Sequence, residues 1–290
     1  MRIVYHLGVH CTDNERLLRC LLKNRGVLAE QSIVVPDPAR YRNLLRDTAI
    51  SLKGQPASLE TQAIVLDQIM DEDQADRLVL SWDNFLSFPK WAVRGSLYPS
   101  AGVRIRAFTQ IFPQIEAEFH LAIRNPATFL PDLFLRRKDS SFEEFLDKTQ
   151  PEDLHWSDMI RDILTQNPGV PLTVWCDEDT PLIWPEVVQA VSGHAPGTRM
   201  ADLHELLRRL MTDDGLTRMQ SYLDTHPPTS VIQRRRIVSA FLDKFAVPEM
   251  IEMEVDLPGW TEDLVERITR TYEADALAIA AMPGVTFLEA

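Results

Sequence analysis

Short apolar runs alternate along this chain with stretches in which apolar residues recur three or four positions apart. The short runs end at turn residues, as buried strands do, and the longer stretches have the period of helices that bury one face. The pattern therefore indicates strands and helices in alternation, which predicts an α/β fold. The expected strands lie at 3–7, 32–35, 78–81, 118–123 and 172–176.

The turn after the first expected strand leads directly into a helix. Gly8 ends the strand, and Leu17 and Leu21 begin the helical pattern. Thr12 and Glu15 have the spacing of a capping box, in which each side chain satisfies a backbone N–H of the first helical turn. In α/β folds, such a strand-turn-helix junction is where phosphate groups bind, because free N–H groups and the helix dipole converge there.

The residues of this turn resemble a known phosphate-binding sequence. The run from His6 to Glu15, HLGVHCTDNE, resembles the opening of bacterial sulfotransferases, roughly H-I-G-x-H-K-T-G-T-T, which holds the 5′-phosphosulfate of phosphoadenosine phosphosulfate (PAPS). The resemblance rests on His6, Leu7, Gly8, His10 and Thr12. The chain departs from the family at four positions, where Cys11 replaces the phosphate-binding Lys, Asp13 replaces Gly, and Asn14 and Glu15 replace hydroxyl residues.

A second block resembles the same family and departs from it in the same sense. The strand ending at Ile123 runs into Arg124, and Pro126 then opens a helix. The resemblance implies that Arg124 and a Ser eight residues later hold the 3′-phosphate of PAPS. Asp132 stands at that eighth position, so a carboxylate replaces a phosphate ligand here too. Pairing of Arg124 with Asp132 or Asp83 is the competing structural interpretation.

These changes oppose phosphate binding by amounts that matter. A carboxylate about 5 Å from a phosphate charge, at an effective dielectric of about 20, is repelled by about 3 kcal/mol. Acidic side chains in a first helical turn also stabilise the empty helix by about 0.3–1 kcal/mol each. We therefore expect Asp13 and Glu15 to act as built-in anions in place of a phosphate.

The resemblance implies one sulfotransferase-like domain over residues 1–290. Its expected fold is a three-layer, mostly parallel sheet with helices on both faces, related to the P-loop nucleotide hydrolases. The core is expected over about 1–225 and a helical C-terminal extension over about 226–290.

Candidate catalytic groups follow the expected strands. Asp83 comes after the strand at 78–81, and ligands of parallel sheets bind beyond the carboxyl ends of the strands, so Asp83 is the candidate base, with His10 or the cluster 177–179 as alternatives. The long segment 85–103 has the length of a lid or binding loop. His6, His10 and Cys11 could share a metal, and the 177–179 acids resemble metal ligands, but hydrogen-bonded histidines and solvated acids are the simpler interpretations, and no metal site is expected.

Composition limits the partners. The net charge is −13, which disfavours nucleic acid and anionic membranes because both need clustered cations. No run of about 20 apolar residues occurs, the N-terminus lacks a signal-peptide layout, and three cysteines without metal spacing fit a reducing compartment. A cytoplasmic protein is therefore expected.

Two functional interpretations remain open, and a metal site at His6, His10 and Cys11 is a less favoured third. In the first, PAPS binding has been lost, no cofactor is bound, and the protein binds a different small molecule or a protein. In the second, it is an active sulfotransferase that transfers a sulfuryl group from PAPS to a hydroxyl or amine through a non-standard donor site. The sequence does not decide whether the protein is an enzyme.

Overall fold

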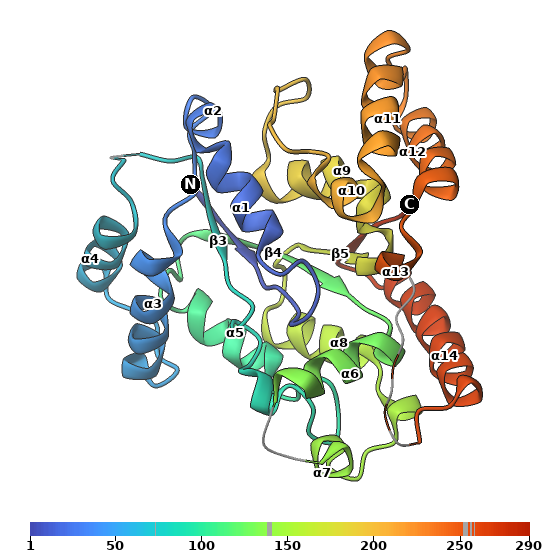
Figure 1. The fold of residues 1–290 in the computed structure, drawn as a ribbon. Coiled ribbons are helices and arrows are strands. Elements are labelled where there is room, and N and C mark those ends of the chain that lie inside the picture. The colour runs from blue at the N-terminus through green and yellow to red at the C-terminus, as the bar shows by residue number, and fades with distance from the viewer. Residues whose placement is uncertain (73, 138–140, 252–254, 256, 258) are drawn as a thin grey trace.

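The computed structural model describes residues 1–72, 74–137, 141–251, 255, 257 and 259–290. Within them, the predicted α/β architecture is confirmed: a six-stranded sheet, parallel throughout, crosses the molecule in the order β2-β3-β1-β4-β5-β6 (Figure 1). The strands are β1 (Arg2–His6), β2 (Ile33–Val34), β3 (Arg77–Ser81), β4 (Glu116–Ile123), β5 (Leu172–Cys176) and β6 (Val285–Leu288).

Strand order places two loops side by side at the carboxyl edge of the sheet. The chain leaves β1 towards β2 on one side, whereas it leaves β4 towards β5 on the other. This reversal is the topological switch point at which open α/β sheets bind ligands. His6, the last residue of β1, pairs with Ser81 of β3 and His120 of β4. The turn after β1 therefore lies between the ends of β3 and β4.

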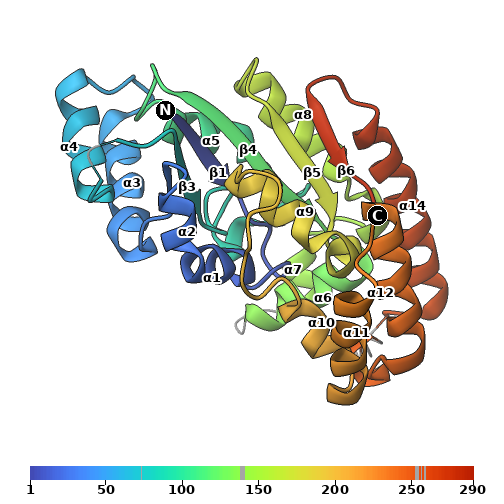
Figure 2. The same cartoon turned by 90° about the horizontal axis from the view of Figure 1, so that it is seen from above.

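Helices cover both faces of the sheet, as predicted, and make three layers (Figure 2). One face packs on α1 (Arg16–Lys23), α2 (Arg25–Ala29) and α9 (Thr180–Ser192). The other face packs on α3 (Pro38–Leu52), α4 (Leu59–Ile69), α5 (Ala101–Thr109), α6 (Pro126–Arg136), α7 (Phe142–Leu146), α8 (Trp156–Gln166) and α14 (Glu262–Ala280). Strand side chains alternate between the layers, so Tyr5 enters the second core and Val4 the first.

Local capping signals set several helix starts correctly. The Asp37 carboxylate accepts from the Ala39 N–H at the start of α3, and Ser58 caps α4 in the same way. The buried face of α4 differs from its apolar spacing, however. Gln62, Val65 and Ile69 are buried, whereas Leu59 is 67% exposed, because the packing of α4 against α3 decides which face turns inward.

The segment 85–103 is not an open lid. It contains a short 3₁₀ turn, η1 (Pro89–Trp91), and runs through the core on the second face, where Phe85, Val93 and Tyr98 are buried. Phe85 packs edge-on against Tyr5 of β1 and Phe108 of α5. These aromatic contacts hold the segment against the sheet.

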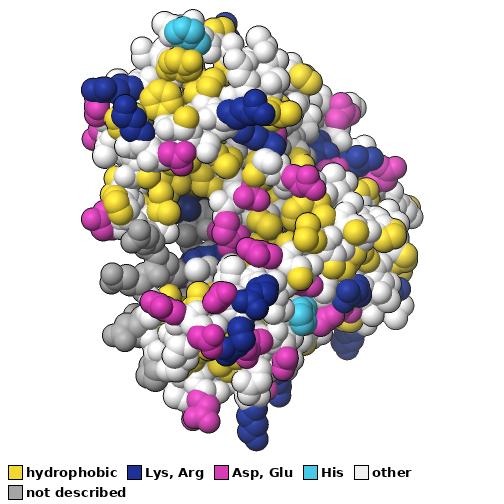
Figure 3. Space-filling model, turned by 90° about the vertical axis from the view of Figure 1, so that its right-hand side faces the viewer, with side chains coloured by type: hydrophobic (Ala, Val, Ile, Leu, Met, Phe, Trp, Pro, Cys, Tyr) yellow, Lys and Arg dark blue, Asp and Glu magenta, His cyan; other side chains and the backbone are white. Residues whose placement is uncertain are grey.

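The C-terminal part divides between the sheet and a peripheral helical group. The group comprises α10 (Glu205–Leu210), α11 (Asp213–Thr225), α12 (Val231–Phe245) and α13 (Pro248–Ile251). It has a small core of its own and carries intermingled acidic and basic side chains on the face seen in Figure 3. By contrast, α14 packs on the sheet, and β6 extends it beside β5. We had not expected a strand at 285–288.

The helices among the described residues lack the combination of length and apolar character that a bilayer span requires.

Candidate functional site

The turn after β1 adopts a tight left-handed path rather than the predicted capping box. Glu15 has a φ of 62° and lies outside the helix, which begins at Arg16. The Thr12 hydroxyl donates to the Val9 carbonyl at 2.7 Å instead of accepting from the helix. The capping-box prediction is therefore wrong, because the left-handed residue at position 15 turns its side chain away from the helix start.

Asp13 caps the helix in place of Thr12. One carboxylate oxygen of Asp13 accepts from the Leu17 N–H at 2.9 Å, and the other accepts from the Glu15 N–H at 3.2 Å. An anion therefore already occupies free N–H groups at the N-terminus of α1, where the positive end of the helix dipole stabilises it. This is the arrangement expected for a built-in anion.

Glu15 does not share that role. Its carboxylate forms an ion pair with the Arg42 guanidinium of α3 at 2.7 Å. Of the two acids expected to replace the phosphate, Asp13 alone accepts from N–H groups of this helix start within the described contacts.

Arg124 follows β4 and joins this strand to the turn. Its guanidinium pairs with Asp132 of α6 at 2.7 Å and donates to the Cys11 carbonyl and, at 3.1 Å, to the Thr128 hydroxyl. The predicted structural pairing of Arg124 with Asp132 is therefore present. The cation that the resemblance assigns to the 3′-phosphate is next to a carboxylate of the helix that follows it.

Little space remains around the turn. A cavity of about 20 Å³ lies there, which is room for about one water molecule. Gly8, with a φ of 52°, lies so close to β3 that a Cβ atom would stand 3.1 Å from the Asp83 Cα. The exit of β3 thus packs directly on the turn. The cavity is lined by His6, Gly8, Val9, Cys11, Asp13, Asn14, Glu15, Arg42, Ser81, Asp83 and Arg136.

Asp83, the candidate base, lies in this small cavity. Its carboxylate accepts from the Asn84 side-chain amide at 3.1 Å. A general base must reach the proton of a bound acceptor. A space of about one water leaves no room for an acceptor beside Asp83 in this arrangement.

His10 is a buried, hydrogen-bonded residue. Its ring stacks on Tyr98 with the Nδ1 atom 2.7 Å from the tyrosine hydroxyl, and its Nε2 atom lies 3.3 Å from the Asn84 side-chain oxygen. Because that oxygen accepts, Nε2 carries the proton and Nδ1 accepts from Tyr98. Burial lowers the pKa of His10, which favours this neutral form.

His6 is held separately from His10. The Nδ1 atom of His6 lies 2.8 Å from the Ser81 hydroxyl at the end of β3. Among the described residues, no three His, Cys, Asp or Glu side chains come together as a metal site would require.

The acids at 177–179 form η3 (Asp177–Asp179), a 3₁₀ turn after β5. Glu178 accepts from the Asn125 N–H at 2.7 Å and from the Tyr272 hydroxyl at 2.9 Å, so it joins β4, β5 and α14. Asp177 instead lines a second, larger pocket, and burial raises the pKa of its carboxyl to about 7.

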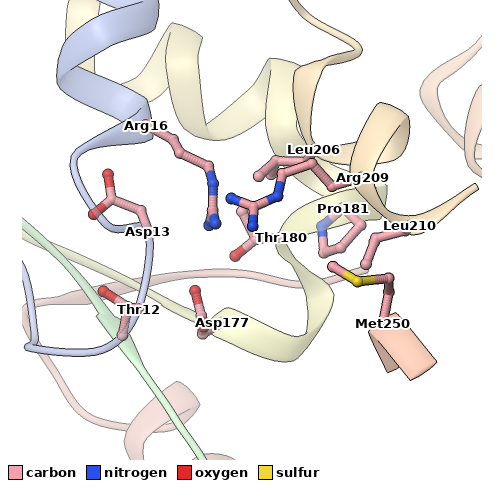
Figure 4. Close-up of a pocket in the computed structure, with 10 residues that line it drawn as sticks. All are labelled: Thr12, Asp13, Arg16, Asp177, Thr180, Pro181, Leu206, Arg209, Leu210 and Met250. Atoms are coloured by element: carbon pink, nitrogen blue, oxygen red, sulfur yellow. The ribbon is translucent and has the colours of Figure 1, made fainter. Parts of the chain in front are cut away.

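Two residues of this larger pocket were not singled out from the sequence. Arg16 is the first residue of α1, and Arg209 lies in the last turn of α10 (Figure 4). Both have the appearance of ordinary helix-end residues in the sequence. Their meeting depends on the packing of α1 and α10 against α9, for which the sequence carries no local signal.

Comparisons with known proteins leave the family open. No protein-family model matches the chain. No curated protein matches it. No solved structure matches its fold.

Proposed function

We propose that this protein is a diverged relative of the PAPS-dependent sulfotransferases that no longer binds PAPS and instead binds another small molecule or a protein. The observation that carries the proposal is the Asp13 carboxylate on the N–H groups of Leu17 and Glu15. A phosphosulfate would need these same donors and would meet a fixed negative charge.

The size of the cavity supports the same conclusion. Sites for drug-sized ligands have volumes of about 300–1,000 Å³, whereas the cavity at the turn has about 20 Å³. Three contacts hold the turn around this cavity. Arg124 donates to the Cys11 carbonyl, Glu15 forms an ion pair with Arg42, and Arg136 donates to the Asn14 side-chain oxygen. A nucleotide would have to displace all three contacts.

The competing function is an active sulfotransferase. The position of Arg124 beside the turn favours this function, because a ligand of the 3′-phosphate would lie there. Thermal melting with adenosine 3′,5′-bisphosphate, the product nucleotide of PAPS, separates the two. A ligand at about 100 times its Kd stabilises a protein by about 2.7 kcal/mol, which would raise Tm by about 5 °C. We expect no shift at millimolar nucleotide. A clear upward shift overturns the proposal in favour of the transferase.

A further inference from the structure

A pocket of about 220 Å³ lies at the start of α1 and shares only Asp13 with the small cavity of the turn. Residues from six regions meet in it: the turn after β1, the start of α1, η3, the start of α9, and helices α10 and α13 (Figure 4). It is lined by Thr12, Asp13, Arg16, Asp177, Thr180, Pro181, Leu206, Arg209, Leu210 and Met250.

Two like charges converge inside this pocket. The guanidinium groups of Arg16 and Arg209 extend into it next to each other (Figure 4). Burial, and after it the charge of Arg209, lowers the pKa of Arg16, whereas the carboxylates of Asp13 and Asp177 act in the opposite direction. The two guanidinium groups repel each other unless an anion lies between them.

Within the part of the chain that the structure describes, neither guanidinium forms an ion pair, although the carboxylates of Asp13 and Asp177 line the same pocket. The ion pairs and hydrogen bonds found among the described residues include none from the side chain of Arg16 or Arg209. The Nε atom of Arg16 is buried and lacks a hydrogen-bond partner there. A buried donor without an acceptor costs about 1–3 kcal/mol, more when it is charged, and a bound anion would supply the missing acceptor.

One side of the pocket is apolar. Pro181, Leu206, Leu210 and Met250 gather on the side of the pocket from which Arg209 extends (Figure 4). Planar guanidinium groups bind carboxylates and phosphates through paired hydrogen bonds, and the apolar side suits a hydrocarbon. We propose that this pocket binds a small acid, with its carboxylate or phosphate between Arg16 and Arg209 and a short apolar tail against Leu206, Leu210 and Met250.

Two acids in the lining affect this binding differently. Asp13 is neutralised in part by the N–H groups it caps. Asp177 lines the same pocket, and burial raises the pKa of its carboxyl to about 7, which favours its neutral form near neutral pH far more than for a free carboxyl. The charged groups around it are Asp13, Arg16 and Arg209, with Arg124 after β4 and its neighbour Glu178.

A bound anion would raise the pKa of Asp177 further, because it adds a negative charge nearby. Binding should therefore take up a proton and weaken as the pH rises through 7. Between pH 6 and pH 8 the linkage of one proton allows Kd to increase by up to about tenfold. Asp177→Asn should remove this pH dependence and keep the binding.

The inference goes beyond the proposed function and stands apart from it. The proposed loss of PAPS binding rests on the turn and Arg124, whereas the proposed binding of a small acid rests on Arg16 and Arg209. Binding of adenosine 3′,5′-bisphosphate would overturn the proposed function and leave the small-acid proposal unaffected. Failure of the small acid to bind would overturn the small-acid proposal and would not imply that PAPS binds.

The test is titration calorimetry of the full chain at pH 6 with hexanoate, n-butyl phosphate and inorganic phosphate. Comparison of the Kd values of hexanoate and n-butyl phosphate shows which acid group the pocket prefers. Comparison of n-butyl phosphate with inorganic phosphate measures how much the apolar tail contributes to affinity. We expect at least one tailed acid to bind, and to bind more tightly than inorganic phosphate. Absence of binding by both tailed acids at 10 mM overturns the proposal.

Matched charge removals locate the site. Arg209→Gln should weaken binding by about tenfold or more, the effect of one charge-assisted hydrogen bond, and so should Arg16→Gln. Arg208→Gln removes the same charge from the neighbouring position of α10, outside the pocket lining, and should leave Kd unchanged. Equal weakening by Arg208→Gln and Arg209→Gln would mean non-specific attraction and would overturn the assignment. Arg209 is exposed and lies near the end of its helix, so its replacement keeps the test valid even if Arg16→Gln fails to fold.

Discussion

Replacement of Asp13 tests whether its carboxylate stabilises the empty turn. In Asp13→Ala, the Leu17 and Glu15 N–H groups lose acceptors at 2.9 and 3.2 Å. Loss of a capping side chain costs about 0.5–2 kcal/mol, and loss of the charge at the helix dipole costs about 0.3–1 kcal/mol. We therefore expect the free energy of unfolding to fall by about 1–3 kcal/mol. Asp13→Asn keeps an acceptor and loses only the charge, so its cost should be about 1 kcal/mol or less.

Urea unfolding at pH 7, followed by tryptophan fluorescence, measures both variants. Asp37→Ala is the matched control, because the Asp37 carboxylate caps α3 by accepting from the Ala39 N–H at 2.8 Å in a helix unrelated to the site. It should lose a similar capping contribution. If Asp13→Ala is as stable as the native protein or more stable, Asp13 is a strained residue and the reasoning about a built-in anion fails.

Three further predictions concern neighbouring residues. Asp177→Asn should raise Tm at pH 8 and change it little near pH 4. Folding raises the pKa of the Asp177 carboxyl to about 7, so the native protein loses stability as the pH rises from about 4 to 7 and this carboxyl becomes charged. Equal Tm differences at both pH values would contradict this. Gly8→Ala should lower the free energy of unfolding by at least about 1–2 kcal/mol in a urea titration, because a left-handed φ and a Cβ atom 3.1 Å from the Asp83 Cα both oppose the methyl group; an unchanged midpoint would refute the close packing. The native protein should transfer no label from ³⁵S-PAPS to mixed hydroxyl and amine acceptors. If turnover is found and Asp83 is the base, Asp83→Asn should reduce the rate by about 10²–10⁴-fold. An unaltered rate would mean that the base is His10 or Asp177 instead.

The sequence was sufficient for elements whose signals are local. Each of the five predicted strands is present within two residues of its expected bounds, because an apolar run that is short, bounded by turn residues and rich in β-branched residues favours a buried strand over a helix. The starts of α3 and α6 follow from Asp37, Asn125 and the prolines after them. Val285 to Leu288 carries the same kind of signal, a β-branched and aromatic run after Pro283 and Gly284, and it forms β6.

The features that the sequence did not predict depend on long-range packing. The left-handed backbone at Glu15 is imposed by the turn that packs on β3 and overrides the capping spacing. The side chains of Arg16 and Arg209 line the same pocket because α10 packs on α9, which also contacts α1, and these two residues are 193 positions apart in the chain. Pairing of Arg124 with Asp132 is one of the two pairings expected from the sequence, because an Arg near carboxylates commonly forms an ion pair with one of them.

The measurement that tests the central claim most directly is calorimetric titration of adenosine 3′,5′-bisphosphate into the native protein and into one restored variant. The variant combines Cys11→Lys, Asp13→Gly, Asn14→Ser, Glu15→Ser and Asp132→Ser, which returns the family's residue types to the turn and frees Arg124 from its carboxylate. Ser is chosen at position 15 because a β-branched Thr would be strained at a φ of 62°. The account predicts no binding by the native protein and at least weak binding by the folded variant. A folded variant that binds no nucleotide, or a native protein that binds it equally well, would contradict the claim that the carboxylates replace the phosphates.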